Sequence, residues 1–346
     1  MQSMHGGDVY AHPGVLDFSA NINPLPAPQE IMDAAAKGLG LLEQYPDPFC
    51  RELRSRIAQK KSCQPEQVIC GNGAAELLYS LVLARKPKNA LVVSPGFMEY
   101  ERALQSVGAH VRHFMLQREN KYRLTGEYLD ALTAGTDMAF LCSPNNPTGS
   151  LIDNYLMGQI VSICEKKHIF LVVDECFQDF ISSPQKYTLE GAISRNQQLF
   201  LLKSFTKIYR LAGLRLGYGL CGDRELLERM NGYRQPWAVS LPAQLAGVVA
   251  LEQEEYVRET RSYMEEQRKW MTRALRNRGY EVFEPSANYL FFQGKVGLQE
   301  KLLQRRILIR DCSNYYGLDR GYYRVAIRKP EENELLLREL DRISSR

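Results

Sequence analysis

Lys207 is the residue of this sequence best suited to covalent chemistry. It ends the segment Lys203-Ser204-Phe205-Thr206-Lys207, which follows an apolar run, and Arg215 lies a short way beyond it. Lysine is the side chain that forms an imine with an aldehyde, and a neighbouring positive charge favours the free amine that this reaction requires. The hydroxyls of Ser204 and Thr206 and the guanidinium of Arg215 are suited to bind a phosphate beside that amine. The segment therefore predicts a lysine that binds an aldehyde carrying a phosphate, although a surface lysine is the alternative for Lys207 taken alone.

A carboxylate and an amide follow two other apolar runs. Asp174 comes directly after the run at 170–173, and Asn146 lies in the turn Ser143-Pro144-Asn145-Asn146-Pro147-Thr148-Gly149 after the run at 138–142. A carboxylate at this place would suit a cofactor with a cationic ring nitrogen, and the amide of Asn146 could donate to a phenolate oxygen. An isolated aspartate at the end of a strand is more often a turn or helix-capping residue, so its chemical role depends on the motifs around it.

Two further segments offer contacts for a phosphate and for a flat ring. The glycine-rich turn at 71–76 leads into the apolar stretch 77–81, so the backbone N–H groups of Gly73, Ala74 and Ala75 would lie at a helix N-terminus, where anions bind. Phe97 follows Pro95-Gly96 after another apolar run and could stack on a ring. Ordinary turn chemistry and a core aromatic are the alternatives for these two segments.

The apolar runs predict the sheet that positions these residues. They recur with helical stretches between them, which is typical of a mainly parallel sheet covered on both faces and hence of an α/β fold. The runs are residues 67–70, 90–94, 138–142, 169–173, 199–202 and 214–220. In such a sheet ligands bind at the carboxyl ends of the strands, which is where the candidate residues fall.

The order of elements also predicts two lobes. A chain of 346 residues exceeds the roughly 250 to 300 residues at which a single core stops growing. After about Trp237 the sequence changes to a long charged helical stretch (252–277) and short strands (281–283, 289–292 and 322–327), which predicts a smaller α+β lobe. We therefore expect a large domain at 41–236, a small domain at 237–346, and an N-terminal segment at 1–40 that packs with the small domain and the substrate site.

The composition argues against several classes of function. With 45% hydrophobic and 24% charged residues the chain resembles an ordinary globular protein, and it has no run of about 18 apolar residues that would cross a membrane. The net charge of +4 is too small and too dispersed to predict a nucleic-acid surface. The first ten residues lack the pattern of a secretory signal, so the expected location is the cytoplasm. The eight scattered cysteines form no C-x-x-C pair and predict reduced thiols, with no metal site.

Four motifs together resemble one enzyme family. Ser-Pro-Asn-Asn-Pro-Thr-Gly at 143–149, Val-Asp-Glu at 173–175, Ser-Phe-Thr-Lys at 204–207 and Gly-Leu-Arg-Leu-Gly-Tyr at 213–218 are similar, in order and spacing, to those of fold-type I pyridoxal-phosphate (PLP) enzymes of the aminotransferase class. The resemblance covers almost the whole chain. It implies PLP as the cofactor and the aspartate aminotransferase fold, an α/β fold with a mainly parallel, seven-stranded sheet in the large domain and a smaller α+β domain.

The resemblance also implies a role for each candidate residue. Lys207 becomes the Schiff-base lysine, Asp174 the partner of the pyridine nitrogen, and Asn146 the donor to the ring's phenolic oxygen. Phe97 becomes the stacking ring. The implied phosphate-binding positions are Gly73, Ala74, Ala75, Ser204 and Arg215. Tyr45 matches a tyrosine that in relatives reaches the phosphate of the neighbouring subunit's cofactor, which implies a homodimer with shared active sites.

The C-terminal part supplies candidate substrate contacts. Arg324, in Tyr323-Arg324-Val325-Ala326-Ile327-Arg328, aligns with the family's carboxylate-binding arginine. Arg328 is an additional guanidinium, and together with Arg310 it would suit a substrate with a second anionic group, such as a phosphorylated amino acid. Solvated surface arginines are the alternative for Arg310 and Arg328.

The beginning of the chain sharpens the choice within the family. Residues 4–7 and 16–25 look like the opening of threonine-phosphate decarboxylases, the cobalamin-pathway relatives of histidinol-phosphate aminotransferase, and residues 310–314 agree with them. In those relatives the N-terminal segment folds over the substrate pocket, so His5 and Asn23 become candidate substrate contacts. A disordered N-terminus is the alternative for His5.

The function implied by this resemblance is decarboxylation of L-threonine O-3-phosphate to (R)-1-aminopropan-2-yl phosphate and CO2 in cobalamin biosynthesis. Serine phosphate stays open as a variant substrate, because one missing methyl group is worth only about 1 to 3 kcal/mol in a pocket. Phe177 agrees with this branch, since many aminotransferases have a tyrosine three residues after the aspartate. The enzymatic alternative is a histidinol-phosphate-type aminotransferase that uses 2-oxoglutarate or glutamate. A regulator of the same fold without catalysis is disfavoured by the presence of Lys207, Asp174 and Arg215.

Overall fold

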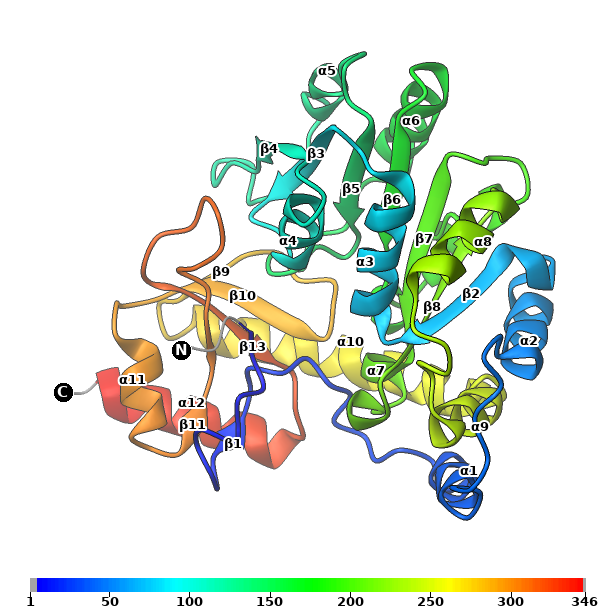
Figure 1. Cartoon of the computed structure of the whole chain (residues 1–346). Helices are drawn as coiled ribbons and strands as arrows, with labels where there is room; N and C mark the ends of the chain where they lie inside the picture. The colour runs from blue at the N-terminus through cyan, green and yellow to red at the C-terminus, as the bar shows by residue number, and fades with distance from the viewer. Residues whose placement is uncertain (1–4, 345–346) are drawn as a thin grey trace.

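The computed structural model describes residues 5–344, and Figure 1 shows how they are arranged. A large lobe surrounds a seven-stranded sheet, and a small lobe surrounds a four-stranded sheet. The large sheet has the strand order β2-β8-β7-β6-β5-β3-β4. Its strands are β2 (Val68–Asn72), β3 (Asn89–Ser94), β4 (His110–Met115), β5 (Met138–Cys142), β6 (Phe170–Asp174), β7 (Leu199–Ser204) and β8 (Leu216–Cys221).

The large sheet is mainly parallel. Strands β3 to β7 pair in parallel, whereas β8 is antiparallel to both of its neighbours, β2 and β7. Six strands coincide with the predicted apolar runs to within two residues at either end. The edge strand β4 has no predicted run, because its side chains are exposed or only partly buried and include two histidines and an arginine. The predicted α/β fold is confirmed.

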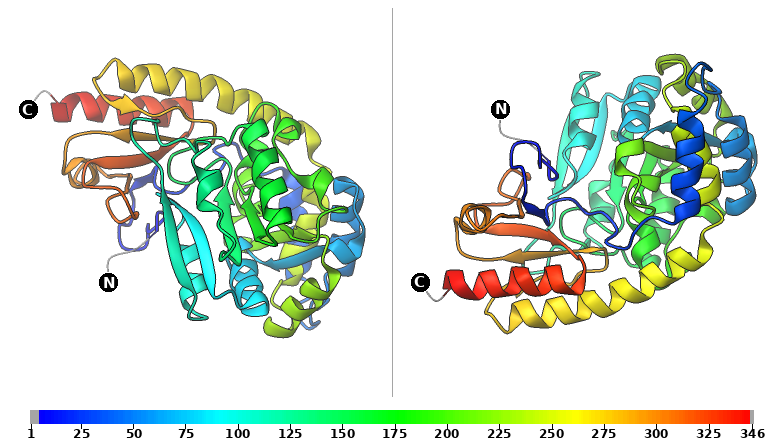
Figure 2. Two further views of the ribbon diagram at one scale, coloured as in Figure 1. Left: turned by 90° about the horizontal axis from the view of Figure 1, so that it is seen from above. Right: turned by 90° about the horizontal axis from the view of Figure 1, so that it is seen from below.

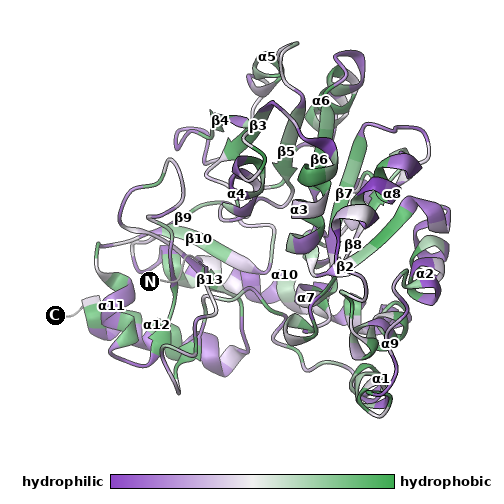
Figure 3. Ribbon diagram, viewed as in Figure 1, coloured by the Kyte–Doolittle hydropathy of each residue, from purple (hydrophilic) through white to green (hydrophobic). Residues whose placement is uncertain are grey.

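Helices cover both faces of this sheet. One apolar core joins Phe140 and Val172 to α3 (Ala74–Arg85), α4 (Glu99–Gln105) and α8 (Arg224–Tyr233). The other joins Leu141 and Leu171 to α2 (Arg51–Lys61), α6 (Asn154–Lys166) and α9 (Leu241–Ala250). Figure 3 shows the strands mostly in the hydrophobic colour, while the helices carry hydrophilic residues on their outer sides. Because both faces of the strands are buried, the polar site residues are found at the strand ends.

The small lobe contains a second sheet, with the order β12-β13-β10-β9 and antiparallel pairing throughout. Its strands are β9 (Glu281–Val282), β10 (Tyr289–Gln293), β12 (Arg310–Asp311) and β13 (Tyr322–Ala326). The long helices α10 (Glu254–Arg276) and α12 (Pro330–Ser344) lie side by side on the outside of this lobe (Figure 2). Helix α11 (Leu298–Leu303) packs on the short strand β11 (Ile307–Leu308).

The N-terminal segment contacts both lobes. Strand β1 (Leu16–Asp17) pairs in parallel with β11 of the small lobe, whereas α1 (Gln29–Leu39) packs along α9 beside the large lobe. Residues 1–4, which include Met4 of the opening motif, lie outside the described part of the chain. The domain limits at residues 40 and 236 stay predictions.

Within residues 5–344, no helix combines the length and the apolar character that crossing a membrane requires. The same residues contain no group of three or more His, Cys, Asp or Glu side chains arranged to hold a metal ion. All eight cysteines are free thiols, and seven of them are buried.

Candidate active site

A cavity opens where the carboxyl ends of the large sheet meet the small lobe. Five of the residues that line it from the large lobe lie at or just after the ends of β3, β5, β6 and β7: Phe97, Asn146, Asp174, Ser204 and Lys207. The small lobe contributes Tyr315 and Arg324, and the N-terminal segment contributes His5, Gly6 and residues 19–22. Three separate parts of the chain therefore enclose one site.

Lys207 lies in α7 (Phe205–Ile208), the short helix that begins directly after β7. Ser204 caps this helix, because its Oγ accepts a hydrogen bond from the backbone N of Thr206 at 3.1 Å. The Nζ of Lys207 donates to Oγ1 of Thr206 at 3.1 Å. Burial lowers the pKa of the Lys207 ammonium, and the guanidinium of Arg215 acts in the same direction. The site thus favours the free amine, which is the nucleophile in imine formation.

Two glycines bring backbone N–H groups close to Arg215. Gly73 precedes α3 with φ of 80°, and a Cβ atom there would lie 2.5 Å from Nη2 of Arg215. On β8, a Cβ atom at Gly217 would lie 2.5 Å from the backbone N of Ala74. The absence of both side chains lets the N-terminus of α3 lie against the strand and the guanidinium.

The hydroxyl of Ser204 belongs to the same group of donors. Ser204 is the register partner of Gly217 in the sheet, and its Oγ lies 2.6 Å from Oγ1 of Thr206. Ala74, Ala75, Ser204, Thr206 and Arg215 all line the cavity, whereas Gly73 lies behind them against Arg215. Free N–H groups at a helix N-terminus, hydroxyls and a guanidinium are the donors that bind phosphate groups in proteins.

Asp174 is the last residue of β6, and its side chain is buried in the cavity wall. Its Oδ1 accepts a hydrogen bond from the backbone N of Cys176 at 2.9 Å, and its Oδ2 accepts one from the hydroxyl of Tyr100 at 2.6 Å. Two donors from different elements therefore fix the plane of the carboxylate.

Asn146 connects the two lobes. Its Oδ1 accepts hydrogen bonds from Nη1 of Arg324 and from the hydroxyl of Tyr315, the latter at 3.3 Å. Nη2 of Arg324 donates to the backbone O of Ser19 at 2.8 Å, so the guanidinium also holds the N-terminal segment. Because Oδ1 faces these donors, the Nδ2 group of Asn146 points the other way and is the donor that a ligand would meet.

The N-terminal strap (residues 5–23) crosses the cavity. Nε2 of His5 lies 2.8 Å from Oε1 of Glu99, and the imidazole ring lies 5.7 Å from the ring of Phe97. Glu99 is buried and also accepts from the hydroxyl of Tyr79 at 2.8 Å and from Nη1 of Arg102 at 2.9 Å. These contacts anchor the beginning of the strap to the large lobe and place His5 in the cavity lining, as expected.

Asn23 does not line the cavity, and its expected contact with the substrate stays a prediction. Its Nδ2 donates to the backbone O of Ile208 at 2.8 Å, and to the hydroxyls of Tyr256 and Thr260 at 2.9 Å each. The backbone N of Asn23 donates to the carbonyl of Lys207 at 3.1 Å. Asn23 therefore ties the strap to the segment that carries Lys207, and it is Asn21 that faces the cavity.

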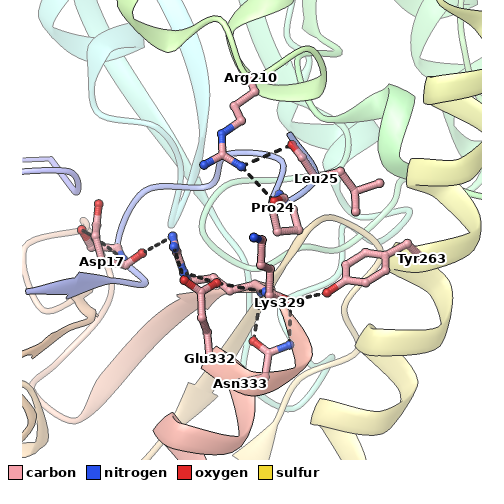
Figure 4. A network of polar contacts seen from close by, with 10 residues as sticks. Asp17, Pro24, Leu25, Arg210, Tyr263, Lys329, Glu332 and Asn333 are labelled. Carbon is pink, nitrogen blue, oxygen red and sulfur yellow. Dashed lines mark hydrogen bonds and ion pairs between the residues drawn. The ribbon is translucent and has the colours of Figure 1, made fainter. Parts of the chain in front are cut away.

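Arg328 also lies outside the cavity lining. Its partners Asp17, Glu332 and Tyr263 are labelled in the polar network of Figure 4. Its Nε and Nη2 donate to the carboxylate of Glu332 at 3.1 and 2.8 Å, and its Nη1 donates to the backbone O of Asp17 at 2.8 Å. The carbonyl of Arg328 accepts from the hydroxyl of Tyr263 at 2.6 Å. These protein contacts join β1 to the first turn of α12, and the expected role of Arg328 as a second anion-binding arginine stays a prediction.

Tyr45 is 78% exposed, and its ring packs against that of Trp237 in a tilted arrangement at a centroid distance of 4.6 Å. It does not line the cavity of its own chain. Its predicted contact with a cofactor phosphate therefore requires a second subunit and stays a prediction.

Several residues of the site were not predicted from the sequence. Tyr100 had a usable signal, because it follows Phe97 by three residues and one helical turn brings both onto the same side. Glu99, Asn21 and Tyr315 had none, because each gains its place through a partner far away in the sequence.

The donor set of the cavity fits PLP. A buried amine is available for the aldehyde, a buried carboxylate for the pyridine nitrogen, and an amide nitrogen for the phenolic oxygen. Phe97 supplies an aromatic ring, and the close approach of Gly73 and Gly217 leaves room for the phosphate donors to converge. Apart from Arg215, which precedes β8, the groups that the cofactor would need lie at or just after the ends of β2, β3, β5, β6 and β7.

The family model for aminotransferase class I and II matches residues 13–340. The chain belongs to this family. It is 38% identical over 347 residues to threonine-phosphate decarboxylase of Salmonella typhimurium, which covers 97% of this chain and 95% of that protein. It is 30% identical over 335 residues to histidinol-phosphate aminotransferase of Methanothermobacter thermautotrophicus, with 93% and 87% covered.

The similarity extends to solved structures of the family. The crystal structure of histidinol-phosphate aminotransferase from Clostridium acetobutylicum matches with a TM-score of 0.89 at 28% identity, over 96% of this chain and 99% of that chain. The aspartate aminotransferase fold is thereby confirmed. Enzymes of this family depend on PLP.

Proposed function

We propose that this enzyme decarboxylates L-threonine O-3-phosphate to (R)-1-aminopropan-2-yl phosphate and CO2, a reaction of cobalamin biosynthesis. The observation that carries the proposal is the 38% identity to a threonine-phosphate decarboxylase across 97% of the chain, against 30% to a histidinol-phosphate aminotransferase. Phe177 supports it, because this ring packs edge-on against Tyr289 and has no hydroxyl for the phenolic oxygen of the cofactor. Serine phosphate stays open as a variant substrate.

PLP is the proposed cofactor, and the site residues have the roles predicted from the resemblance. Lys207 would hold its aldehyde carbon, Asp174 its ring nitrogen, Asn146 its phenolic oxygen and Phe97 its ring face. The phosphate would be held by Gly73, Ala74, Ala75, Ser204 and Arg215, and the missing side chain of Gly73 leaves the space for Arg215.

When bound, PLP supplies an electron sink for the pair of electrons that remains at the substrate Cα after the carboxylate leaves. The protein chooses which Cα bond breaks by holding the carboxylate. Arg324 is suited to this task, because its contacts with Ser19 and Asn146 fix the plane of the guanidinium. Lys207, whose neutral amine is favoured by burial, could accept the proton that the substrate's ammonium group releases and then return a proton to Cα, and Asp174 would keep a proton on the ring nitrogen.

The basic side chains that line the cavity within the described residues are His5, Lys207, Arg215 and Arg324. In this proposal Lys207 takes the aldehyde, Arg215 the cofactor phosphate and Arg324 the substrate carboxylate. His5 is then the basic group that meets the phosphate of the substrate. The strap would thus distinguish a phosphorylated amino acid from an ordinary one.

We also propose a homodimer with shared active sites. Large apolar side chains are exposed along α1, the segment after it and the segment before α9, as is typical of a protein–protein interface. They are Met32, Leu39, Leu42, Tyr45, Phe49 and Trp237. The mass of the native protein in solution tests this directly, since a monomer at micromolar concentration would contradict it.

The test of the reaction is incubation of the PLP-loaded protein with L-threonine O-3-phosphate in the absence of any keto acid. We expect CO2 and the phosphorylated amino alcohol in equal amounts. An absence of CO2, together with conversion of histidinol phosphate only when 2-oxoglutarate is added, would assign the protein to the aminotransferase branch instead.

A further inference from the structure

Tyr100 is a buried polar residue of the cavity that has no role in the reaction proposed above. Its side chain is 3% exposed, and its hydroxyl donates to Oδ2 of Asp174 at 2.6 Å. The distance is that of a charge-assisted hydrogen bond between a hydroxyl and a carboxylate. Tyr100 therefore contacts the residue that is proposed to hold the ring nitrogen of the cofactor.

The surroundings make this hydrogen bond important for the charge of Asp174. The thiols of Cys142 and Cys176 lie next to the carboxylate, and burial raises the pKa of both, so neither carries a charge there. A buried carboxylate is costly unless donors satisfy it. Tyr100 supplies one donor, and the backbone N of Cys176 supplies another at 2.9 Å.

The proton of this pair stays on the phenol. Burial raises the pKa of Tyr100 well above its usual range, and the neighbouring carboxylate raises it further. A neutral phenol is a permanent donor, so Tyr100 keeps a hydrogen bond on the Asp174 carboxylate that a cationic ring nitrogen would meet.

Packing leaves Tyr100 little freedom. Its ring meets that of Phe97 edge-on at a centroid distance of 5.6 Å and stacks on Phe140 at 5.4 Å. Phe97 lies two residues before α4, and the backbone N of Tyr100 donates to its carbonyl at 3.2 Å, so one short piece of backbone carries both the ring-stacking residue and the partner of Asp174.

We propose that Tyr100 is a positioning residue of the cofactor site. It acts through Asp174, whose orientation and negative charge it fixes for the ring nitrogen of PLP. This inference rests on the proposed use of PLP.

Tyr100→Phe tests the proposal, because it removes the hydroxyl and keeps the ring between Phe97 and Phe140. The matched control is Tyr128→Phe: Tyr128 is fully buried, also packs edge-on against a phenylalanine, and has a hydroxyl with no hydrogen-bond partner among the described residues. The apo forms of both variants and of the wild type are titrated with PLP and, separately, with 1-deazapyridoxal phosphate, which has carbon in place of the ring nitrogen.

For PLP, we expect the dissociation constant of Tyr100→Phe to rise about tenfold or more, as for loss of a hydrogen bond to a charged group, and that of Tyr128→Phe to stay at the wild-type value. For the deaza analogue, wild type and Tyr100→Phe should bind within about twofold of each other, because the atom that Asp174 meets is missing. In an Asp174→Asn background, Tyr100→Phe should likewise have no further effect.

Two results would overturn the inference and leave the proposed function standing. One is unchanged PLP affinity in Tyr100→Phe. The other is an equal loss of affinity for PLP and for the deaza analogue, which would mean that the hydroxyl only supports the fold. A wild-type protein that binds no PLP would instead refute the proposed function itself.

Discussion

The two sides of the cavity are built in different ways. On the sheet side, neighbouring parallel strands deliver their side chains to one edge: Asp174 ends β6, Ser204 ends β7, and Cys142, the register partner of Asp174, ends β5 shortly before Asn146. The opposite side, which we call the strap side, is formed by the N-terminal strap and the small lobe. There Arg324 lies within β13 and donates a hydrogen bond to the carbonyl of Ser19, a residue far away in the sequence.

This difference separates two kinds of function. The sheet side is fixed by strand register and by buried hydrogen bonds such as that between Tyr100 and Asp174. The strap side is fixed by a few long-range contacts to residues 5–23. We therefore expect substitutions on the sheet side to change cofactor binding and chemistry, and substitutions on the strap side to change substrate binding.

The largest expected effect is that of Lys207→Ala on the sheet side. CO2 release should fall about 10³-fold or more, because the amine that binds the aldehyde and carries the proton to Cα is lost. Release of 13CO2 from labelled threonine phosphate measures it. Lys186→Ala, at an exposed lysine, should keep the wild-type rate. A wild-type rate in Lys207→Ala would contradict the account.

The second-largest expected effect is the loss of kcat/KM in Arg324→Lys on the strap side, for which Arg328→Lys is the comparison. Arg324→Lys keeps the charge and loses the planar fork, so kcat/KM for threonine phosphate should fall about 10- to 100-fold. Arg328→Lys should change kcat/KM by less than about threefold and lower the unfolding free energy by less than about 1 kcal/mol, because the partners of Arg328 are Glu332 and a backbone carbonyl. Similar losses of kcat/KM in both variants would show that Arg328 does bind the substrate.

Acid unfolding tests how firmly the sheet side is held. Nζ of Lys203 lies 2.7 Å from Oε2 of Glu175 and 2.6 Å from Oε1 of Glu190. In the sequence Glu175 follows Asp174, and Lys203 precedes Ser204. Burial alone would raise the pKa of Glu190, but Lys203 and Lys61 lower it to about 2 from an ordinary value of 4.5. Since the folded state lowers this pKa, the stability from Glu190 is present above pH 4.5 and is lost as the pH falls towards 2.

Glu190→Gln should therefore remove about 2 kcal/mol of the unfolding free energy at pH 6 and flatten its decrease between pH 5 and 3. Urea unfolding at a series of pH values measures both. Parallel curves for the variant and the wild type over this range would mean that Glu190 does not carry this stability.

The smallest expected effect is that of Glu99→Gln, which leaves a side chain of similar shape beside His5 without its charge. The KM for threonine phosphate should rise about three- to tenfold, with kcat within about twofold of wild type. Glu101→Gln, which alters a carboxylate 3.6 Å from His113, is the matched control and should leave KM unchanged. Because Glu99 is expected to act through His5, the KM of Glu99→Gln combined with His5→Ala should equal that of His5→Ala, and a multiplied effect would speak against the contact.

The two sides also differed in what the sequence could predict. Asp174, Asn146, Phe97, Ser204 and Lys207 all line one cavity, because residues that follow buried parallel strands lie together at the carboxyl ends of those strands. The edge strand β4 is not among the predicted apolar runs, because its half-buried polar residues do not form one.

On the strap side, residue type alone was not sufficient. An asparagine or an arginine near a site can bind either a ligand or the protein, and the partners decide which. Asn23 is held by Ile208, Tyr256 and Thr260, and Arg328 is held by Glu332, so neither reaches the cavity. The acceptors that bind Asn23 lie far from it in the sequence, and Glu332 lies four residues after Arg328. Only the folded structure shows that these acceptors occupy the donors of the two side chains.

The most direct measurement of the central claim is a competition in one vessel. The PLP-loaded enzyme is given carboxyl-labelled L-threonine O-3-phosphate, histidinol phosphate and 2-oxoglutarate, and 13CO2 and glutamate are followed together. We predict that 13CO2 accumulates in step with (R)-1-aminopropan-2-yl phosphate while glutamate does not form. Formation of glutamate without 13CO2 would contradict the account and identify an aminotransferase.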